Sequence, residues 1–175
     1  AALMTNLASF SLISTKLTDV APLPQLGSLR TLQLDVPASV DLDPLAQRAE
    51  LTDFNVTTTA QHDLGFLDEM TLDRVKVIAK DKRPFRNTGI PVTRSGFTVS
   101  GAELSDLADF AGWSGPNIAV FAPKATDLTP LAGSRPKMLI LDSAATDLTP
   151  VGQMKGLTHL WLTGPLTDLT PLADL

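Results

Sequence analysis

A six-residue motif recurs along this chain at a nearly fixed interval, and it limits the possible folds more than any other feature. Thr126–Leu131 reads TDLTPL, and almost the same letters return at Thr146–Val151 and Thr167–Leu172. Looser copies begin at aspartates earlier in the chain, and successive aspartates lie 22, 22, 43, 21, 20 and 21 residues apart. These aspartates are Asp19, Asp41, Asp63, Asp106, Asp127, Asp147 and Asp168. Because the long interval spans two periods, we infer a further unit that has lost the motif, and the repeat predicts a solenoid of stacked coils.

A second pattern precedes each aspartate and predicts a short strand. It reads apolar-x-x-apolar-x-apolar, as in Leu157, Leu160 and Leu162. The last two apolar residues lie two apart, which is the spacing of a strand with one buried face. Other clear copies are Leu7/Phe10/Leu12, Leu29/Leu32/Leu34, Leu51/Phe54/Val56 and Leu72/Val75/Val77, and weaker ones are Pro116/Ala119/Phe121 and Pro136/Leu139/Leu141. With Phe97 and Val99 in the unit that lacks the motif, we expect eight strands.

The second half of each unit is too short for a full helix. Thr129, Thr149 and Thr170 each precede a proline, so we expect threonine N-caps followed by tight 3₁₀ turns. The motif aspartate can accept a hydrogen bond from a nearby backbone amide in an Asx-type turn. Residues 1–175 are therefore expected to form a single α/β-type repeat solenoid, with a parallel β-sheet, short 3₁₀ or irregular convex turns and few full helices.

The repeat resembles the leucine-rich-repeat family, and within it the bacterial internalin-like type with units of about 22 residues. Leu157, Leu160 and Leu162, followed by Thr167–Leu172, carry the resemblance, and the other copies extend it over nearly the whole chain. It implies a bacterial protein that binds a protein partner, with a secreted or cell-surface location favoured and a cytoplasmic one still open. One column departs from the family, which usually has asparagine three residues after the last strand apolar. That column here reads Thr15, Pro37, Thr59, Lys80, Ala102, Lys124, Ala144 and Pro165, so we expect a less regular coil.

Composition excludes several classes of protein. The chain has 175 residues, no cysteine and a net charge of −5. The absence of cysteine excludes disulfides, thiolate zinc sites and cysteine nucleophiles, and the acidic balance argues against a general nucleic-acid binder. No apolar run is long enough for a transmembrane segment, and the first residues lack the features of a signal peptide. Both ends stop inside a unit, so we expect a fragment of a longer chain with flanking domains.

The strand residues that point away from the core form the first candidate site. In the last three units we expect apolar side chains there, edged by a histidine. The predicted partner-binding residues are Ile118, Val120, Met138, Ile140, His159 and Trp161. A contiguous exposed apolar patch with a tryptophan is typical of a protein interface. Two alternatives stay open: another part of the full protein covers the patch, or the strand register slips by one residue and exchanges the two faces.

The irregular interval 78–101 forms the second candidate site. It concentrates positive charge in an acidic chain, and we expect a protruding hairpin or loop. Its basic residues are Lys80, Lys82, Arg83, Arg86 and Arg94. Such a loop could contact an acidic partner or an anionic surface, although a solvated surface loop is the simpler interpretation.

Catalysis finds little support in the sequence. His62 and His159 lie far apart in the array, and no phosphate-binding loop or metalloprotease motif occurs. We therefore expect no enzyme activity, no cofactor and no metal. The leading hypothesis is a module that binds a protein through its open sheet face. A structural spacer and the substrate-recognition arm of a larger protein remain as alternatives.

Overall fold

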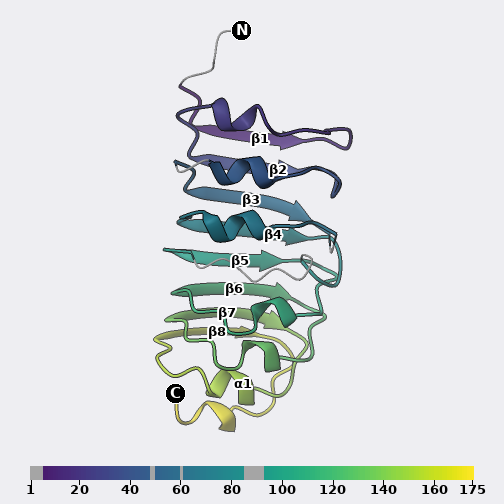
Figure 1. Ribbon diagram of the computed structural model, residues 1–175. Coiled ribbons are helices and arrows are strands. Elements are labelled where there is room, and N and C mark those ends of the chain that lie inside the picture. The colour runs from purple at the N-terminus through teal and green to yellow at the C-terminus, as the bar shows by residue number, and fades with distance from the viewer. Residues whose placement is uncertain (1–5, 48–49, 60, 85–92) are drawn as a thin grey trace.

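A single parallel sheet forms one side of the molecule. The computed structural model describes residues 6–47, 50–59, 61–84 and 93–175. Within these residues eight strands pair in sequence order from β1 to β8, and each neighbouring pair is parallel. Figure 1 shows them stacked from the N-terminal to the C-terminal end. Their bounds are β1 Ser9–Ile13, β2 Thr31–Asp35, β3 Asp53–Thr58, β4 Arg74–Ala79, β5 Gly96–Ser100, β6 Asn117–Ala122, β7 Met138–Ser143 and β8 His159–Thr163. The predicted strands and their parallel order are confirmed.

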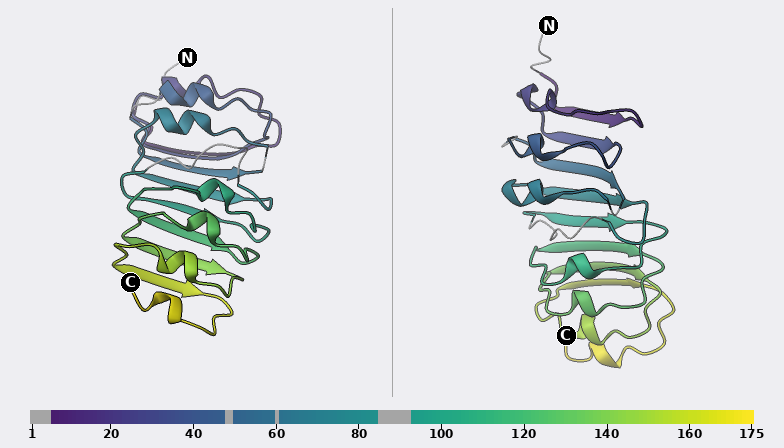
Figure 2. Two further views of the ribbon diagram at one scale, coloured as in Figure 1. Left: turned by 60° about the horizontal axis from the view of Figure 1, so that its bottom comes forward. Right: turned by 45° about the vertical axis from the view of Figure 1, so that its right-hand side comes forward.

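Short helical turns form the opposite layer, and Figure 2 shows them as a row on one side of the sheet. They are η1 Leu23–Gln25, η2 Asp43–Gln47, η3 Gly65–Glu69, η4 Ala108–Phe110, η5 Thr129–Leu131, α1 Thr149–Gly152 and η6 Thr170–Leu172. All but α1 are 3₁₀ turns, and α1 itself has only four residues. The predicted repeat solenoid with short 3₁₀ turns is confirmed. No helix among the described residues has the length and apolar character needed to cross a membrane.

The repeated aspartate closes each coil by an Asx-type turn. In all seven units its Oδ1 accepts a hydrogen bond from the backbone amide two residues later, at 2.7–3.0 Å. In the last three units the following threonine hydroxyl also bonds the carboxylate, and these bonds lower the pKa of Asp127, Asp147 and Asp168. The Asx-type turn predicted for the motif is confirmed.

The predicted threonine N-caps are wrong. Thr129, Thr149 and Thr170 are the first helical residues, and the preceding leucine occupies each cap position without a side-chain bond. The physical reason is that the aspartate two residues earlier already accepts the threonine amide. The threonine hydroxyl is thereby left to bond the carboxylate, and the leucine is free to pack. Leu128 and Leu148 are buried in this way.

The core lies between the sheet and the row of turns. Alternate strand residues point into it, as Leu32 and Leu34 do from β2. Aromatic rings join the layers: Phe97 of β5 meets Phe110 of η4 edge to face, with 6.0 Å between ring centroids. Each coil therefore buries its apolar residues against its neighbours, which is how stability is distributed in a solenoid.

The strand register is continuous across the sheet. Paired residues are offset by 22 residues from β4 to β5, as Arg74 and Gly96 show, and by 21 from β5 to β6, as Phe97 and Ile118 show. The long interval between aspartates thus contains a unit that kept its strand and lost its motif, as predicted. The loop expected within 78–101 falls partly on residues 85–92, which lie outside the described residues.

The register of β6 corrects the sequence interpretation by one residue. Ile118 and Val120 are buried at 2% and 0% exposure, whereas Ala119 and Phe121 lie on the outer side. The cause is the shorter 21-residue unit before β6, which aligns Ile118 and Val120 with the core residues of both neighbouring strands. Ile118 and Val120 are therefore core residues and not surface candidates.

A buried histidine ties two coils together where the family's usual asparagine is missing. His62 is 2% exposed, and its Nδ1 accepts a hydrogen bond from the Thr59 amide at 3.0 Å. Its Nε2 lies 3.2 Å from the Val36 carbonyl oxygen of the preceding coil. Together these bonds require a neutral ring with its proton on Nε2. Burial lowers the pKa of His62, which favours this neutral form.

Candidate binding face

The continuous register arranges the outward side chains into columns that run across the strands. We call the surface formed by these columns the open face. The second outward column reads Ser11, Gln33, Asn55, Lys76, Thr98, Ala119, Ile140 and Trp161. The first column reads Ser9, Thr31, Asp53, Arg74, Gly96, Asn117, Met138 and His159. In these two columns polar side chains occupy β1 to β4, whereas apolar side chains appear only from β6 to β8, at Ala119, Met138, Ile140 and Trp161.

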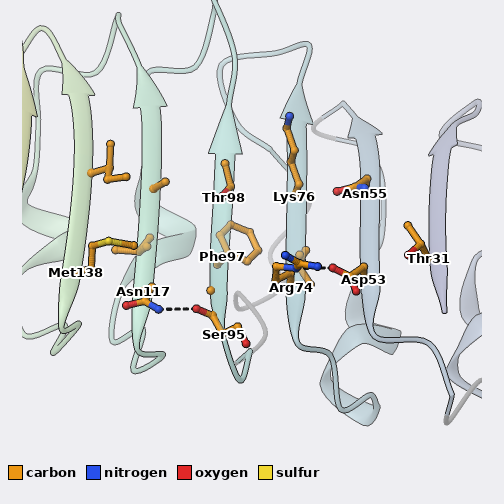
Figure 3. A pocket seen from close by; sticks show the side chains of 15 residues that line it. Thr31, Asp53, Asn55, Arg74, Lys76, Ser95, Phe97, Thr98, Asn117 and Met138 are labelled. Carbon is orange, nitrogen blue, oxygen red and sulfur yellow. Dashed lines mark hydrogen bonds and ion pairs between the residues drawn. The ribbon is translucent and has the colours of Figure 1, made fainter. Parts of the chain in front are cut away.

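The open face is hollowed where β5 and β6 carry small residues. This depression, which we call the central hollow, has a volume of about 560 Å³. Gly96, Thr98 and Ala119 line it on these two strands, and Figure 3 shows Thr98 between the longer side chains of Lys76 on β4 and Met138 on β7. A Cβ atom added at Gly96 would come within 3.3 Å of the Asn117 backbone oxygen, so a larger residue would crowd the floor. The Asn117 side-chain amide donates to the Ser95 carbonyl at 2.6 Å and holds this floor in place.

Charged side chains form the wall of the central hollow on the β4 side. Arg74 donates to Asp53 of the neighbouring strand, and this bond raises the pKa of Arg74. Lys76 projects from the same strand, and no hydrogen bond or ion pair to another described residue holds its ammonium group. In Figure 3 Arg74 is joined to Asp53 by a dashed line and Lys76 is not. On this wall the guanidinium of Arg74 is therefore paired with a carboxylate, whereas the ammonium of Lys76 is available to a ligand.

Apolar side chains form the opposite wall. Met138 and Ile140 of β7 line the central hollow and are half-buried. Beyond them Trp161 of β8 is 70% exposed. His159 is also exposed, and its Nδ1 lies 3.0 Å from the Thr158 hydroxyl. The structure thus brings four of the six predicted partner-binding residues onto one surface, and it excludes the two that are buried in β6.

Sequence reasoning missed two features of the open face. Phe121 points outward from β6 with 37% exposure, and a one-residue shift of the predicted register would have placed it there. The central hollow was also missed, because it depends on Gly96 and Thr98 in the unit whose motif had disappeared. The signal for it was the presence of the small residues Gly96 and Thr98 at the two outward positions that flank Phe97.

The basic residues of the second candidate site do not converge on one point. Lys80 pairs with Asp35 across two strands at 2.8 Å. Arg83 binds Asp109, with 2.6 Å from Nη2 to Oδ1, and its Nε reaches both carboxylate oxygens at 3.2 and 3.3 Å. Burial raises the pKa of Asp109, and the bond to Arg83 opposes this. These contacts anchor the segment to neighbouring coils, which is a structural role.

The remaining basic residues neither support nor contradict the hypothesis that the loop contacts an acidic partner. Lys82 and Arg94 are exposed, and Arg86 lies outside the described residues. Elsewhere in the described part of the chain, no group of three or more histidine, aspartate or glutamate side chains is placed to hold a metal ion. The open face therefore carries the more complete site, with a hollow, a charge and an apolar wall.

Comparison with known proteins identifies the fold. No protein-family model and no curated protein sequence matches the chain. Among solved structures it is similar to an internalin (inlF) of Listeria monocytogenes, with a TM-score of 0.58 and 21% identity over 98% of this chain. It is also similar to internalin C2 of the same organism, with a TM-score of 0.57 and 18% identity over 96% of this chain and 76% of that one. The chain spans about half the length of the first structure, 53%. The internalin-like leucine-rich-repeat fold expected from the repeat is thereby confirmed.

Proposed function

We propose that this chain is a non-enzymatic module that binds a protein partner through its open face. The observation that carries the proposal is Trp161, a large aromatic side chain that is 70% exposed. Tryptophan is costly to leave in water and is enriched among the residues that dominate binding energy. It adjoins Ile140 in the same column, so the two side chains form a contiguous apolar surface. Surfaces of this kind mark interaction sites on soluble proteins.

The architecture supports the proposal in a second way. Among the described residues the helical turns lie on one side of the parallel sheet, so they do not cover the strand side chains on the other side (Figure 2). Repeat proteins use such extended surfaces to bind their partners. The likeness to internalins agrees with a binding module rather than a catalytic one.

The test compares two substitutions in the apolar part of the open face with one at the far end of the sheet. The chain is immobilised and used to select binders from a library of displayed natural protein fragments, and each binder is titrated against purified variants. We expect Trp161→Ala and Ile140→Asp to weaken binding on the order of tenfold or more, as hot-spot residues do. Ile13→Ala is the matched control, because Ile13 is 73% exposed but lies at the far end of the sheet, on β1.

Circular dichroism must show that all three variants are folded like the parent. If Ile13→Ala weakens binding as much as Trp161→Ala does, the apolar part of the open face is not the site. If neither Trp161→Ala nor Ile140→Asp affects any binder, the proposed function is refuted.

A further inference from the structure

We propose that the central hollow recognises an extended protein segment with an acidic side chain and, four residues along, a bulky apolar side chain. This inference rests on the proposed function, because it names the chemistry of the partner for the same face. Three features carry it: an available cation on one wall, an apolar surface on the other, and a fixed distance between them.

The acidic requirement follows from how the charges on the open face are paired. Asp35 is satisfied by Lys80, and Asp53 by Arg74. Lys76 faces the central hollow and has no such partner among the described residues. The chain as a whole has a net charge of −5, so Lys76 is not part of a general basic surface. A carboxylate of the ligand placed against Lys76 would form an ion pair with its ammonium group, as Asp53 does with Arg74.

The apolar requirement follows from the opposite wall. Met138 and Ile140 turn methyl-bearing side chains toward the central hollow, and the exposed ring of Trp161 extends the surface by one strand. Covering this wall removes apolar area from water, which a small anion cannot do. A purely apolar segment would cover the wall but would leave Lys76 without a partner. A ligand that carries both groups satisfies both walls.

The spacing follows from the register. Lys76 pairs with Thr98, Thr98 with Ala119, and Ala119 with Ile140, so Lys76 and Ile140 stand in one column three strands apart. Neighbouring parallel strands lie about 4.8 Å apart, so the two walls are separated by about 14 Å. An extended chain rises about 3.4 Å per residue and therefore covers this distance in about four residues.

The alternation of side chains along an extended chain agrees with that spacing. Side chains alternate between the two sides of an extended segment, so positions i and i+4 both point at the sheet when the segment crosses the strands. Position i+2 then points at Thr98 and Ala119, where the small residues leave room. The hollow between the walls is thus explained as the space for the middle side chain.

The test uses a random displayed library of twelve-residue peptides, selected in parallel on the parent chain and on two charge-reversed variants. Lys76→Glu reverses the free cation. Lys16→Glu is the matched control, because Lys16 is also exposed but lies in the first coil, away from the central hollow. The parent and Lys16→Glu should enrich peptides with Asp or Glu at i and a large apolar residue at i+4. Lys76→Glu should enrich Lys or Arg at i and keep the apolar residue.

Affinities provide a second measurement. Peptides selected on the parent should bind Lys76→Glu on the order of tenfold more weakly, and added salt should reduce this difference because it screens the charges. Titrations can use tryptophan fluorescence, because Trp161 is exposed and Trp113 is buried.

Each outcome decides the matter. The inference is overturned if the selected peptides show no acidic preference, or if selection on Lys76→Glu enriches the same peptides as selection on the parent. If Trp161→Ala still abolishes the binding of those peptides, the proposed function stands. Enrichment at a spacing other than i and i+4 overturns the geometry. Failure to enrich any peptide overturns recognition of a linear segment, while the fragment selection tests the wider function separately. Enriched peptides whose binding neither Trp161→Ala nor Ile140→Asp weakens overturn both proposals.

Discussion

Two substitutions at adjacent positions of β6 should have very different effects on stability. Val120→Asp and Ala119→Asp introduce the same side chain one residue apart. Val120 is fully buried, whereas Ala119 lies on the open face at the central hollow. The register in which Ala119 and Phe121 face the core predicts the opposite order. The pair therefore tests the alignment on which the description of the open face depends.

The expected magnitudes follow from burial. Losing the buried valine side chain costs about 1.5–3 kcal/mol. A carboxylate cannot remain charged in this core, and holding an aspartate neutral at pH 7 costs about 4 kcal/mol. Val120→Asp should therefore lower the free energy of unfolding by about 6 kcal/mol, a large part of the roughly 5–15 kcal/mol typical of a folded domain. Ala119→Asp should cost about 1 kcal/mol, the range of strand propensity.

Urea unfolding followed by circular dichroism measures both changes. Acidification gives an independent check, because the cost of neutralising the buried aspartate disappears once the pH is low enough to protonate aspartate in the unfolded chain as well. Val120→Asp should therefore recover stability relative to the parent as the pH falls from 7 toward 4. The register described for β6 is wrong if Ala119→Asp is the more destabilising substitution, or if the two substitutions have equal effects.

Three further predictions concern the contacts between coils. Arg83→Met should lower the free energy of unfolding at pH 7 by about 3 kcal/mol, because it leaves the buried Asp109 carboxylate unpaired, whereas Lys82→Met should leave urea unfolding unchanged. His62 has a lowered pKa in the folded state, so its contribution to stability is complete above the ordinary histidine pKa and is lost as the pH falls through the lowered one. Thermal melts between pH 7.5 and about 5 should show this loss in the parent but not in His62→Gln. Asp147 also has a lowered pKa, so stability should fall as acid protonates it, and Asp147→Ala should show a smaller acid dependence in melts below about pH 4.5.

Most of the fold could be predicted from the repeat, because each unit carries its own strand and turn signals. The Asx-type turn was expected at Asp127 because its spacing to the following amide is local. Local signals do not determine register between strands. In β6 the pairs Ile118/Val120 and Ala119/Phe121 both have strand spacing, and only the neighbouring strands decide which pair is buried.

The candidate site was predictable only where a single strand carries the signal. Trp161 and Met138 could be placed on the open face from alternation within their own strands. The ion pair between Arg83 and Asp109 could not, because the residues are 26 positions apart and meet only through the path of the coil. The available charge of Lys76 could not be predicted either, because it depends on which acids its neighbours have already paired.

The unbroken register also affects how such a chain can change over evolutionary time. A deletion of one residue within a unit must be absorbed at its turns or it exchanges the faces of a strand, and the 21-residue unit before β6 has absorbed such a difference. Loss or duplication of a complete unit of 21 or 22 residues leaves every remaining side chain on its own face. It changes only the separation between recognition groups, in steps of one strand. Variation by whole coils would therefore alter which partner length fits while preserving the chemistry at each end.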